Sequence, residues 1–321
     1  MIQSVFFMVI LACIQNGDLD SFVQQGLDFT YIEEYDSAKV YFAKAIEYEH
    51  DNPLGYFAYA GLFRIYTSDF VTDSFIDSFF YYADKTIEKA KAELKKDKKS
   101  AWAHFFIGGV QMNISSLYIE QGNYLKALGY AEQSMKAIRT CLEIEPDLFD
   151  AYLVLGSYEY LKGSFPLWSS FKRKGIEKIR IASEKSSYSK SLAKNILAIM
   201  LQREGRFDES IEVALELVTD YPESRTFRWT LCKVYLEKGS WIDAIDNYEI
   251  LLENISEEQP GNIFNSVQAK LALAQAYFGA QQYYKTTALC GEIIDSDTNR
   301  TEVEDMVKEA ENLLEEAKNN M

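Results

Sequence analysis

The sequence predicts an all-α fold, a right-handed superhelical solenoid of about seven helix pairs that ends in a C-terminal capping helix. Three observations predict this class. The 321 residues include only 5 prolines and 16 glycines, too few for the turns of an all-β chain. Hydrophobic residues make up 48% of the chain, which supplies a large packed interior and excludes global disorder. A residue pattern also recurs after 34 positions, from Gly205 to Gly239, which is the length of one helix pair.

Residues 5–14, VFFMVILACI, form a run that is apolar on all sides. The run is shorter than the roughly 20 residues of a membrane-spanning helix and has the length of a signal-peptide core. We therefore expect residues 1–17 to be an export leader and the protein to work in a bacterial periplasm or cell envelope. No Lys or Arg precedes the run, so a cytoplasmic protein whose first helix is buried in the array stays open as the alternative.

Cys13 ends the tetrapeptide Ile-Leu-Ala-Cys, which loosely resembles the box that directs lipidation of bacterial lipoproteins. Cys13 is therefore a candidate lipidation site, and a lipid anchor there, or the leader itself, would bring the array to a membrane. Three further cysteines lie inside apolar helical runs, where small buried side chains are expected, at positions Cys141, Cys232 and Cys290.

The recurring pattern is clearest in residues 201–222 and 235–256. Each segment has a bulky residue four positions before a glycine, an aromatic residue two positions after it, and then a small residue followed by apolar residues three to four positions apart. This unit resembles the tetratricopeptide repeat, whose signature is W-x₂-L-G-x₂-Y, then A-x₃-F, then P. The resemblance implies paired helices that stack, because a single unit cannot bury its apolar face.

Each type of position in the repeat motif has a structural role. Small residues let the two helices of one unit cross closely, and we expect this of Gly26, Ala198, Cys232 and Ala274. Aromatic residues at Phe29, Tyr235 and Tyr277 are expected to fill the space toward the neighbouring unit. The turn glycine supplies the positive φ that ends the first helix, and Gln281 stands at that position in the seventh repeat.

The repeats are expected at residues 19–53, 54–97, 100–146, 147–189, 190–223, 224–258 and 265–298, within a single domain over residues 18–321. A long third repeat, the segment DAYLVLGSYEYLKG and an apolar insertion interrupt the period. Over residues 100–255 this arrangement resembles a group of uncharacterised bacterial exported tetratricopeptide proteins, and the resemblance implies no enzymatic activity. Residues 301–319 carry one apolar stripe opposite an acidic face, as a solenoid's capping helix requires.

The composition excludes several functions. A net charge of −16 argues against nucleic acid as a partner. The two histidines, His50 and His104, have no second histidine at ligand spacing, so neither a metal site nor a cofactor is predicted. The sequence contains no nucleophile motif and no phosphate-binding loop, and its carboxylates fall in turns and on polar helix faces. We therefore expect a non-enzymatic scaffold that binds an unidentified protein or peptide, with its oligomeric state left open.

The tetratricopeptide resemblance places ligand contacts at outward positions of the first helix of each repeat. In this chain those positions form a mixed apolar and polar surface rather than a cluster of Lys and Arg that would hold a C-terminal carboxylate. They are Asn195, Ile199, Gln202, Arg203, Trp229, Lys233, Leu236, Glu237, Leu271, Gln275 and Phe278.

The insertion in the fourth repeat combines aromatic residues with a basic cluster. Its members are Phe165, Leu167, Trp168, Phe171, Lys172, Arg173 and Lys174. Such a segment can touch a membrane surface or a partner, and a membrane-surface adaptor that uses residues 165–180 is the alternative function. The other interpretation is a loop that folds back and buries its aromatic rings against the array.

Overall fold

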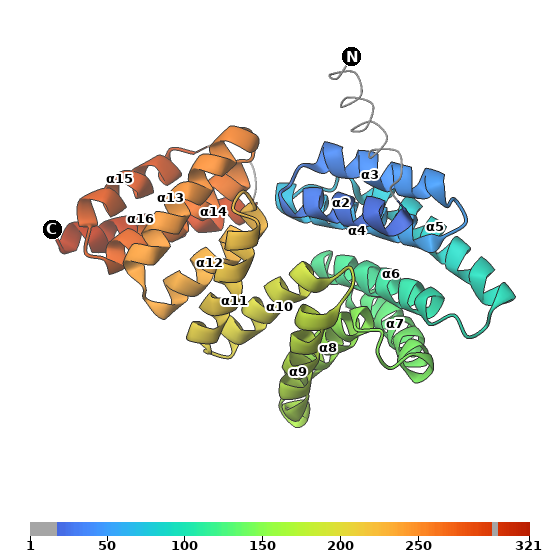
Figure 1. Ribbon diagram of the computed structural model, residues 1–321. Coiled ribbons are helices and arrows are strands. Elements are labelled where there is room, and N and C mark those ends of the chain that lie inside the picture. The colour runs from blue at the N-terminus through green and yellow to red at the C-terminus, as the bar shows by residue number, and fades with distance from the viewer. Residues whose placement is uncertain (1–17, 297–300) are drawn as a thin grey trace, which may run out of the picture. The chain divides into compact units, whose positions relative to one another are not determined.

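The computed structural model describes residues 18–296 and 301–321, so the leader and Cys13 lie outside the described residues. The described residues form fifteen α-helices and one 3₁₀ helix, with no strand among them (Figure 1). No helix in this part of the chain combines the length and the apolar character needed to cross a bilayer. The all-α prediction is therefore confirmed.

The helices from α2 to α15 form seven consecutive pairs, and a last helix follows. Each pair begins within three residues of the corresponding expected repeat, the largest offset being Asp150 against 147. The pairs are α2 (Leu19–Tyr31) with α3 (Tyr35–Tyr48), α4 (Pro53–Phe70) with α5 (Ile76–Lys96), α6 (Ala101–Glu120) with α7 (Tyr124–Ile144), α8 (Asp150–Gly163) with α9 (Ser170–Lys185), α10 (Lys190–Arg203) with α11 (Phe207–Asp220), α12 (Arg225–Lys238) with α13 (Trp241–Glu258), and α14 (Ile263–Gly279) with α15 (Tyr283–Ile294). The 3₁₀ helix η1 (Pro166–Trp168) lies between α8 and α9, and α16 (Thr301–Asn319) ends the chain.

The packing divides the chain into two compact units. The first comprises residues up to Thr67 together with Asp73–Lys190, and the second comprises Ser68–Thr72 together with Ser191–Met321. A single domain over residues 18–321 stays a prediction, because the density of contacts does not measure whether the units fold independently.

Small residues allow the close crossings that the repeat motif predicts. A β-carbon at Gly26 would lie 2.4 Å from Cε1 of Phe42, so only glycine fits between α2 and α3. Ala198 and Ala274, on α10 and α14, are fully buried. The side chain of Ser210 crosses to the first helix of its own pair, where its hydroxyl donates to the Ala198 carbonyl at 2.7 Å. The crossing of α10 and α11 therefore buries the Ser210 hydroxyl and also provides its hydrogen-bond acceptor.

The turns within six of the seven pairs use left-handed backbone, as expected from the turn glycines. Gly122, Gly205 and Gly239 have φ values of 71°, 72° and 79°. In three other pairs the turn residue is not glycine, and Glu33, Val71 and Gln281 adopt φ values of 59°, 51° and 59°. These three residues accept a conformation that costs about 1–2 kcal/mol for a residue with a β-carbon, so the packing of the two helices dictates the turn.

The fourth pair is held together by contacts between backbones and by a buried carboxylate. A β-carbon at Gly175 of α9 would lie 2.6 Å from the Gly156 carbonyl of α8, so the two helices meet glycine against glycine. Asp150, 2% exposed, accepts hydrogen bonds from the backbone N–H groups of Ser187, Tyr188 and Ser189 at 2.9–3.0 Å. This carboxylate fixes the segment between α9 and α10.

The last helix covers the apolar side of the seventh pair, as expected of a capping helix. α16 packs against α14 and α15. Val303, Ala310 and Ala317 on its apolar stripe are buried, and its other face is acidic and exposed. The helix therefore ends the array with a polar surface.

Candidate functional site

The residues expected to contact a partner lie on α10, α12 and α14, and all of them belong to the second unit. Their exposure separates them into three groups. Arg203, Lys233 and Glu237 are exposed; Ile199, Trp229, Leu236, Gln275 and Phe278 are partly buried; and Asn195, Gln202 and Leu271 are buried.

On α14 the expected contact residues are engaged inside the unit. Leu271 is 6% exposed and packs in a buried cluster that includes Val303 and Ala310 of α16. Gln275 Nε2 donates to Oε1 of Glu309, also on α16, at 2.7 Å. The capping helix thus covers Leu271 and binds Gln275, while Phe278 is partly buried and packs edge to face on Tyr283 of α15. The exposed members of the set, Arg203, Lys233 and Glu237, are all on α10 and α12.

Asn195 also has an internal role. Its Oδ1 accepts a hydrogen bond from Thr230 Oγ1 at 2.7 Å, which joins α10 to α12. The more accessible residues of these two helices define what we call the α10–α12 face. It consists of Ile199, Arg203, Trp229, Lys233, Leu236 and Glu237.

Trp229 is the largest apolar side chain of the α10–α12 face. The indole and Leu236 pack on a buried cluster that includes Tyr235 and Tyr248. The Trp229 and Tyr248 ring centroids are 6.1 Å apart in an edge-to-face arrangement. Lys233 Nζ lies 5.5 Å from the Trp229 ring centroid, one helical turn away and within range of a cation–π interaction. The core therefore holds the indole in a fixed orientation beside a cation.

The electrostatic surroundings of Lys233 disfavour its charged form on balance. Its side chain is exposed, yet desolvation lowers the pKa of its ammonium. The neighbouring Glu237 carboxylate opposes this shift, and the Arg203 guanidinium of α10 adds to it. Nearby protein atoms therefore remove part of the hydration of the ammonium. An anionic group placed against Lys233 and Arg203 would restore the lost stabilisation of charge.

The chemistry of the α10–α12 face is that of recognition. It offers an indole, two aliphatic side chains, two cations and one carboxylate, without an adjacent nucleophile and base. Within residues 18–296 and 301–321, no three His, Cys, Asp or Glu side chains lie together as a metal ion would need. His50, which has no second histidine at ligand spacing, has a side chain that is 76% exposed in a turn.

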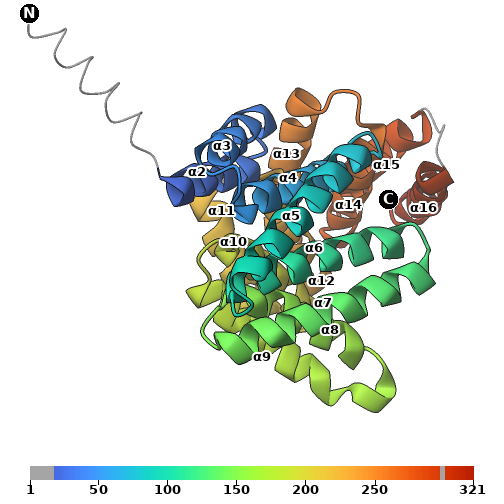
Figure 2. The same ribbon diagram turned by 90° about the vertical axis from the view of Figure 1, so that its right-hand side faces the viewer.

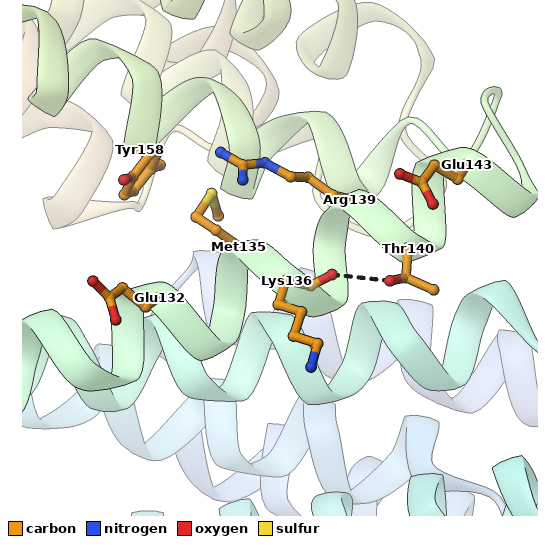
Figure 3. A pocket seen from close by; sticks show the side chains of 7 residues that line it. All are labelled: Glu132, Met135, Lys136, Arg139, Thr140, Glu143 and Tyr158. Atoms are coloured by element: carbon orange, nitrogen blue, oxygen red, sulfur yellow. Dashed lines mark hydrogen bonds between the residues drawn. The ribbon is translucent and has the colours of Figure 1, made fainter.

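An open pocket, which sequence reasoning missed, lies in the first unit (Figure 3). It measures about 380 Å³ and is open to solvent. Six residues of α7 and one of α8 line it, namely Glu132, Met135, Lys136, Arg139, Thr140, Glu143 and Tyr158. Figure 3 shows Arg139 extending toward Tyr158 and Lys136 pointing away from both. Two acids and two bases leave it without net charge, and in the sequence these residues form only an ordinary polar helix face.

The insertion of the fourth repeat is exposed. Phe165, Leu167 and Trp168 are 61%, 90% and 44% exposed. Phe171 and Lys172 are partly buried, while Arg173 and Lys174 are exposed. The interpretation in which the loop buries its aromatic rings against the array is therefore wrong for Phe165 and Trp168. Only five residues separate Ser164 from Ser170, so the connection is too short to return over the helices.

Comparison with known proteins bears on the fold. No family model matches the sequence, and no curated protein matches it. Among solved structures, PilW, described as a widely conserved type IV pilus biogenesis factor, superposes with a TM-score of 0.52 at 13% identity over 77% of this chain and 98% of its own. A tetratricopeptide repeat protein from Parabacteroides merdae has a TM-score of 0.40 at 17% identity over 91% of this chain and 98% of its own. Yeast Tom70 has a TM-score of 0.43 at 11% identity over 97% of this chain and 87% of its own.

The chain has a tetratricopeptide-repeat-like fold. The seven helix pairs, the small crossing residues and the left-handed turns are the features that the repeat motif requires. In this tetratricopeptide-like array, Trp229 and Lys233 occupy outward positions of the first helix of the sixth pair. The superposition with PilW extends the fold assignment over most of the chain, and it assigns no partner.

Proposed function

We propose that the protein is a non-enzymatic scaffold that binds an extended segment of a partner protein on the α10–α12 face. The observation that carries this proposal is the arrangement of Trp229, which the core holds in place, beside the exposed and partly desolvated Lys233. An array of helix pairs displays such a face without the need for a closed pocket.

The partner segment should combine an apolar side chain with an acidic group. The apolar side chain would pack on Trp229 and Leu236. The acidic group would lie against Lys233 of α12 and Arg203 of α10. Glu237 would disfavour segments with acids along their whole length and thereby select the position of the acidic group.

Photo-crosslinking in cells tests this proposal. A benzophenone amino acid is placed at Arg203 on the α10–α12 face, and a matched control carries it at the exposed Glu253 on α13. We expect discrete crosslinked species from position 203 and none from position 253. Charge reversal by Lys233→Glu, in a variant that circular dichroism shows to be folded, should reduce the crosslink at 203 at least about tenfold. Equal crosslinking from both positions, or an unchanged crosslink in Lys233→Glu, would contradict the proposal.

We further propose that the scaffold is exported and works in a bacterial cell envelope. The all-round apolar run at residues 5–14 supports this, and Cys13 is the candidate site of a lipid anchor. Cell fractionation combined with N-terminal analysis of the mature chain tests both statements. An intact Met1 on a cytosolic product would overturn export. A processed, soluble product with a free Cys13 thiol would overturn only the anchor.

A further inference from the structure

Two neighbouring helix connections in the first unit expose apolar side chains. At the α6–α7 turn these are Ile119, Tyr124, Leu125 and Leu128, which are 46%, 69%, 88% and 56% exposed. At the α8–α9 connection they are Leu161, Phe165, Leu167 and Trp168, which are 50%, 61%, 90% and 44% exposed. Leu125 and Leu167 stand out, because nearly the whole of each side chain faces solvent.

Both connections lie at the same edge of the unit. α6 and α8 are the first helices of consecutive pairs, so they run in the same direction and their pairs turn at the same end. α8 packs against both α6 and α7. Figure 2 shows the four helices crossing the view with both connections at the right-hand end. We call this edge, formed by the eight apolar residues above, the tip surface.

The α8–α9 part of the tip surface is ordered by contacts among its own residues. The ring centroids of Phe165 and Trp168 are 6.0 Å apart, edge to face. Lys162 Nζ lies 5.3 Å from the Trp168 ring and 4.5 Å from the Phe171 ring. Lys174 Nζ lies 5.2 Å from the Phe171 ring. Rings and ammonium groups therefore alternate on a projecting tip, and the apolar side chains stay exposed although the loop has a defined conformation.

The charge of this tip is opposite to that of the chain. Between Leu161 and Ile176 there are four cations and no acid, while the chain as a whole carries −16. The cations are Lys162, Lys172, Arg173 and Lys174. At the other connection, residues 119–128 contain one cation, Lys126, and one acid, Glu120, whose carboxylate pairs with Arg64. An anionic partner would meet attraction here and repulsion over most of the remaining surface.

We propose that the tip surface docks onto a lipid bilayer that contains anionic headgroups. Single apolar and aromatic side chains project from two turns and form no hollow, so they would insert between headgroups more readily than they would enclose a folded partner. Trp and Tyr at the level of the headgroups, with cations beside them, are the residue types that favour a membrane interface. The tip surface is in the first unit and shares no residue with the α10–α12 face, so this proposal does not depend on the scaffold proposal.

Vesicle flotation of the full-length protein tests the proposal. The vesicles contain phosphatidylcholine alone or phosphatidylcholine with about 30% phosphatidylglycerol, whose headgroup carries the negative surface charge. We expect the protein to float with the anionic vesicles only and to dissociate as salt is raised. Leu125→Ser combined with Leu167→Ser should weaken binding at least about tenfold, because both side chains lose their insertion into the interface. The matched control is Ile242→Ser with Tyr284→Ser, at residues of the second unit that are 60% and 81% exposed.

The electrostatic part has its own variant. Lys172→Gln, Arg173→Gln and Lys174→Gln together should weaken binding about 100-fold, at about fivefold for each cation removed. The matched control replaces Lys95, Lys98 and Lys99, three exposed lysines in the last turn of α5 and just after it, by Gln. Circular dichroism establishes that each variant is folded before it is compared.

The outcomes distinguish membrane docking by the tip surface from binding elsewhere on the chain and from dimerisation. Acyl chains brominated near the headgroup should quench part of the tryptophan fluorescence, and Trp168→Phe should remove most of that quenching. Absence of flotation, or equal losses in the control and tip variants, would overturn the proposal. If the protein does not float and Leu125→Ser with Leu167→Ser converts a dimer to a monomer in light scattering, the tip surface joins two copies of the chain instead. Crosslinking from Arg203 reports on the scaffold proposal separately.

Discussion

The contact between Trp241 and Gly279 predicts that Gly279→Ala destabilises the protein when Trp241 is present and stabilises it when Trp241 is replaced by Ala. Trp241 begins α13, and Gly279 ends α14 in the next pair. A β-carbon at Gly279 would lie 2.5 Å from Cδ2 of the indole, 2.6 Å from Cε2 and 2.7 Å from Cε3. Three atoms of one rigid ring system are too close, so no rotation of a flexible side chain relieves the overlap.

The magnitude follows from two opposing effects. In the parent, Gly279→Ala should lower the free energy of unfolding by about 1–3 kcal/mol, the cost of overpacking a filled site. In a Trp241→Ala background the overlap is gone, and alanine in a helix is favoured over glycine by about 0.5–1 kcal/mol. The same substitution should then stabilise the protein, and the difference between the two backgrounds gives a coupling energy of about 1.5–4 kcal/mol between the two positions. Trp241→Ala alone should cost about 2–4 kcal/mol, because its ring is only partly buried.

Urea unfolding of the four proteins, followed by far-ultraviolet circular dichroism, measures this cycle. The slope of the free energy with urea should stay the same in all four, which shows that the substitutions act on the folded state. A loss of equal size for Gly279→Ala in both backgrounds would refute the packing argument, since the loss would then have nothing to do with the indole.

Three further predictions rest on separate features. Ala244 is fully buried where α13 crosses its partner, so Ala244→Leu should cost about 1–3 kcal/mol in urea unfolding, and an unchanged midpoint would contradict this placement. Gln281 has a φ of 59°, so Gln281→Gly should raise the free energy of unfolding by about 0.5–1 kcal/mol. Gly205 has a φ of 72° and a β-carbon there would meet no atom within 4 Å, so Gly205→Ala should lower it by about 1 kcal/mol through the backbone alone. Equal effects of the two substitutions would refute the backbone argument. Burial raises the thiol pKa of Cys141 to about 12 and of Cys290 to about 11 from 9.0, so the unfolded chain loses protons first and the free energy of unfolding should fall as the pH rises above 9.0. Both thiols should resist a disulfide reagent at pH 8 in the folded protein and react in denaturant, and rapid labelling of the folded protein would disprove their burial.

Local rules made the array predictable from the sequence. The 34-residue spacing from Gly205 to Gly239 reports helix length and turn geometry, which depend on residues close together in the chain. The crossing at Gly26 and the capping stripe of α16 follow from the same short-range patterns. The spacing and the small crossing residues recur along the chain, so each repeat supports the interpretation of the others.

The tertiary structure decided which positions of the pattern are accessible. Leu271 and Trp229 hold equivalent positions of the seventh and sixth repeats, yet α16 buries Leu271 while Trp229 stays partly exposed. Leu125 is apolar, yet it lies 88% exposed, because it projects at the end of its helix pair. Asp150 has nothing in its sequence neighbourhood to show that it binds three backbone N–H groups almost 40 residues away. Periodicity determines which side of a helix is apolar, whereas burial depends on which other segment packs there, and that is a property of the folded chain alone.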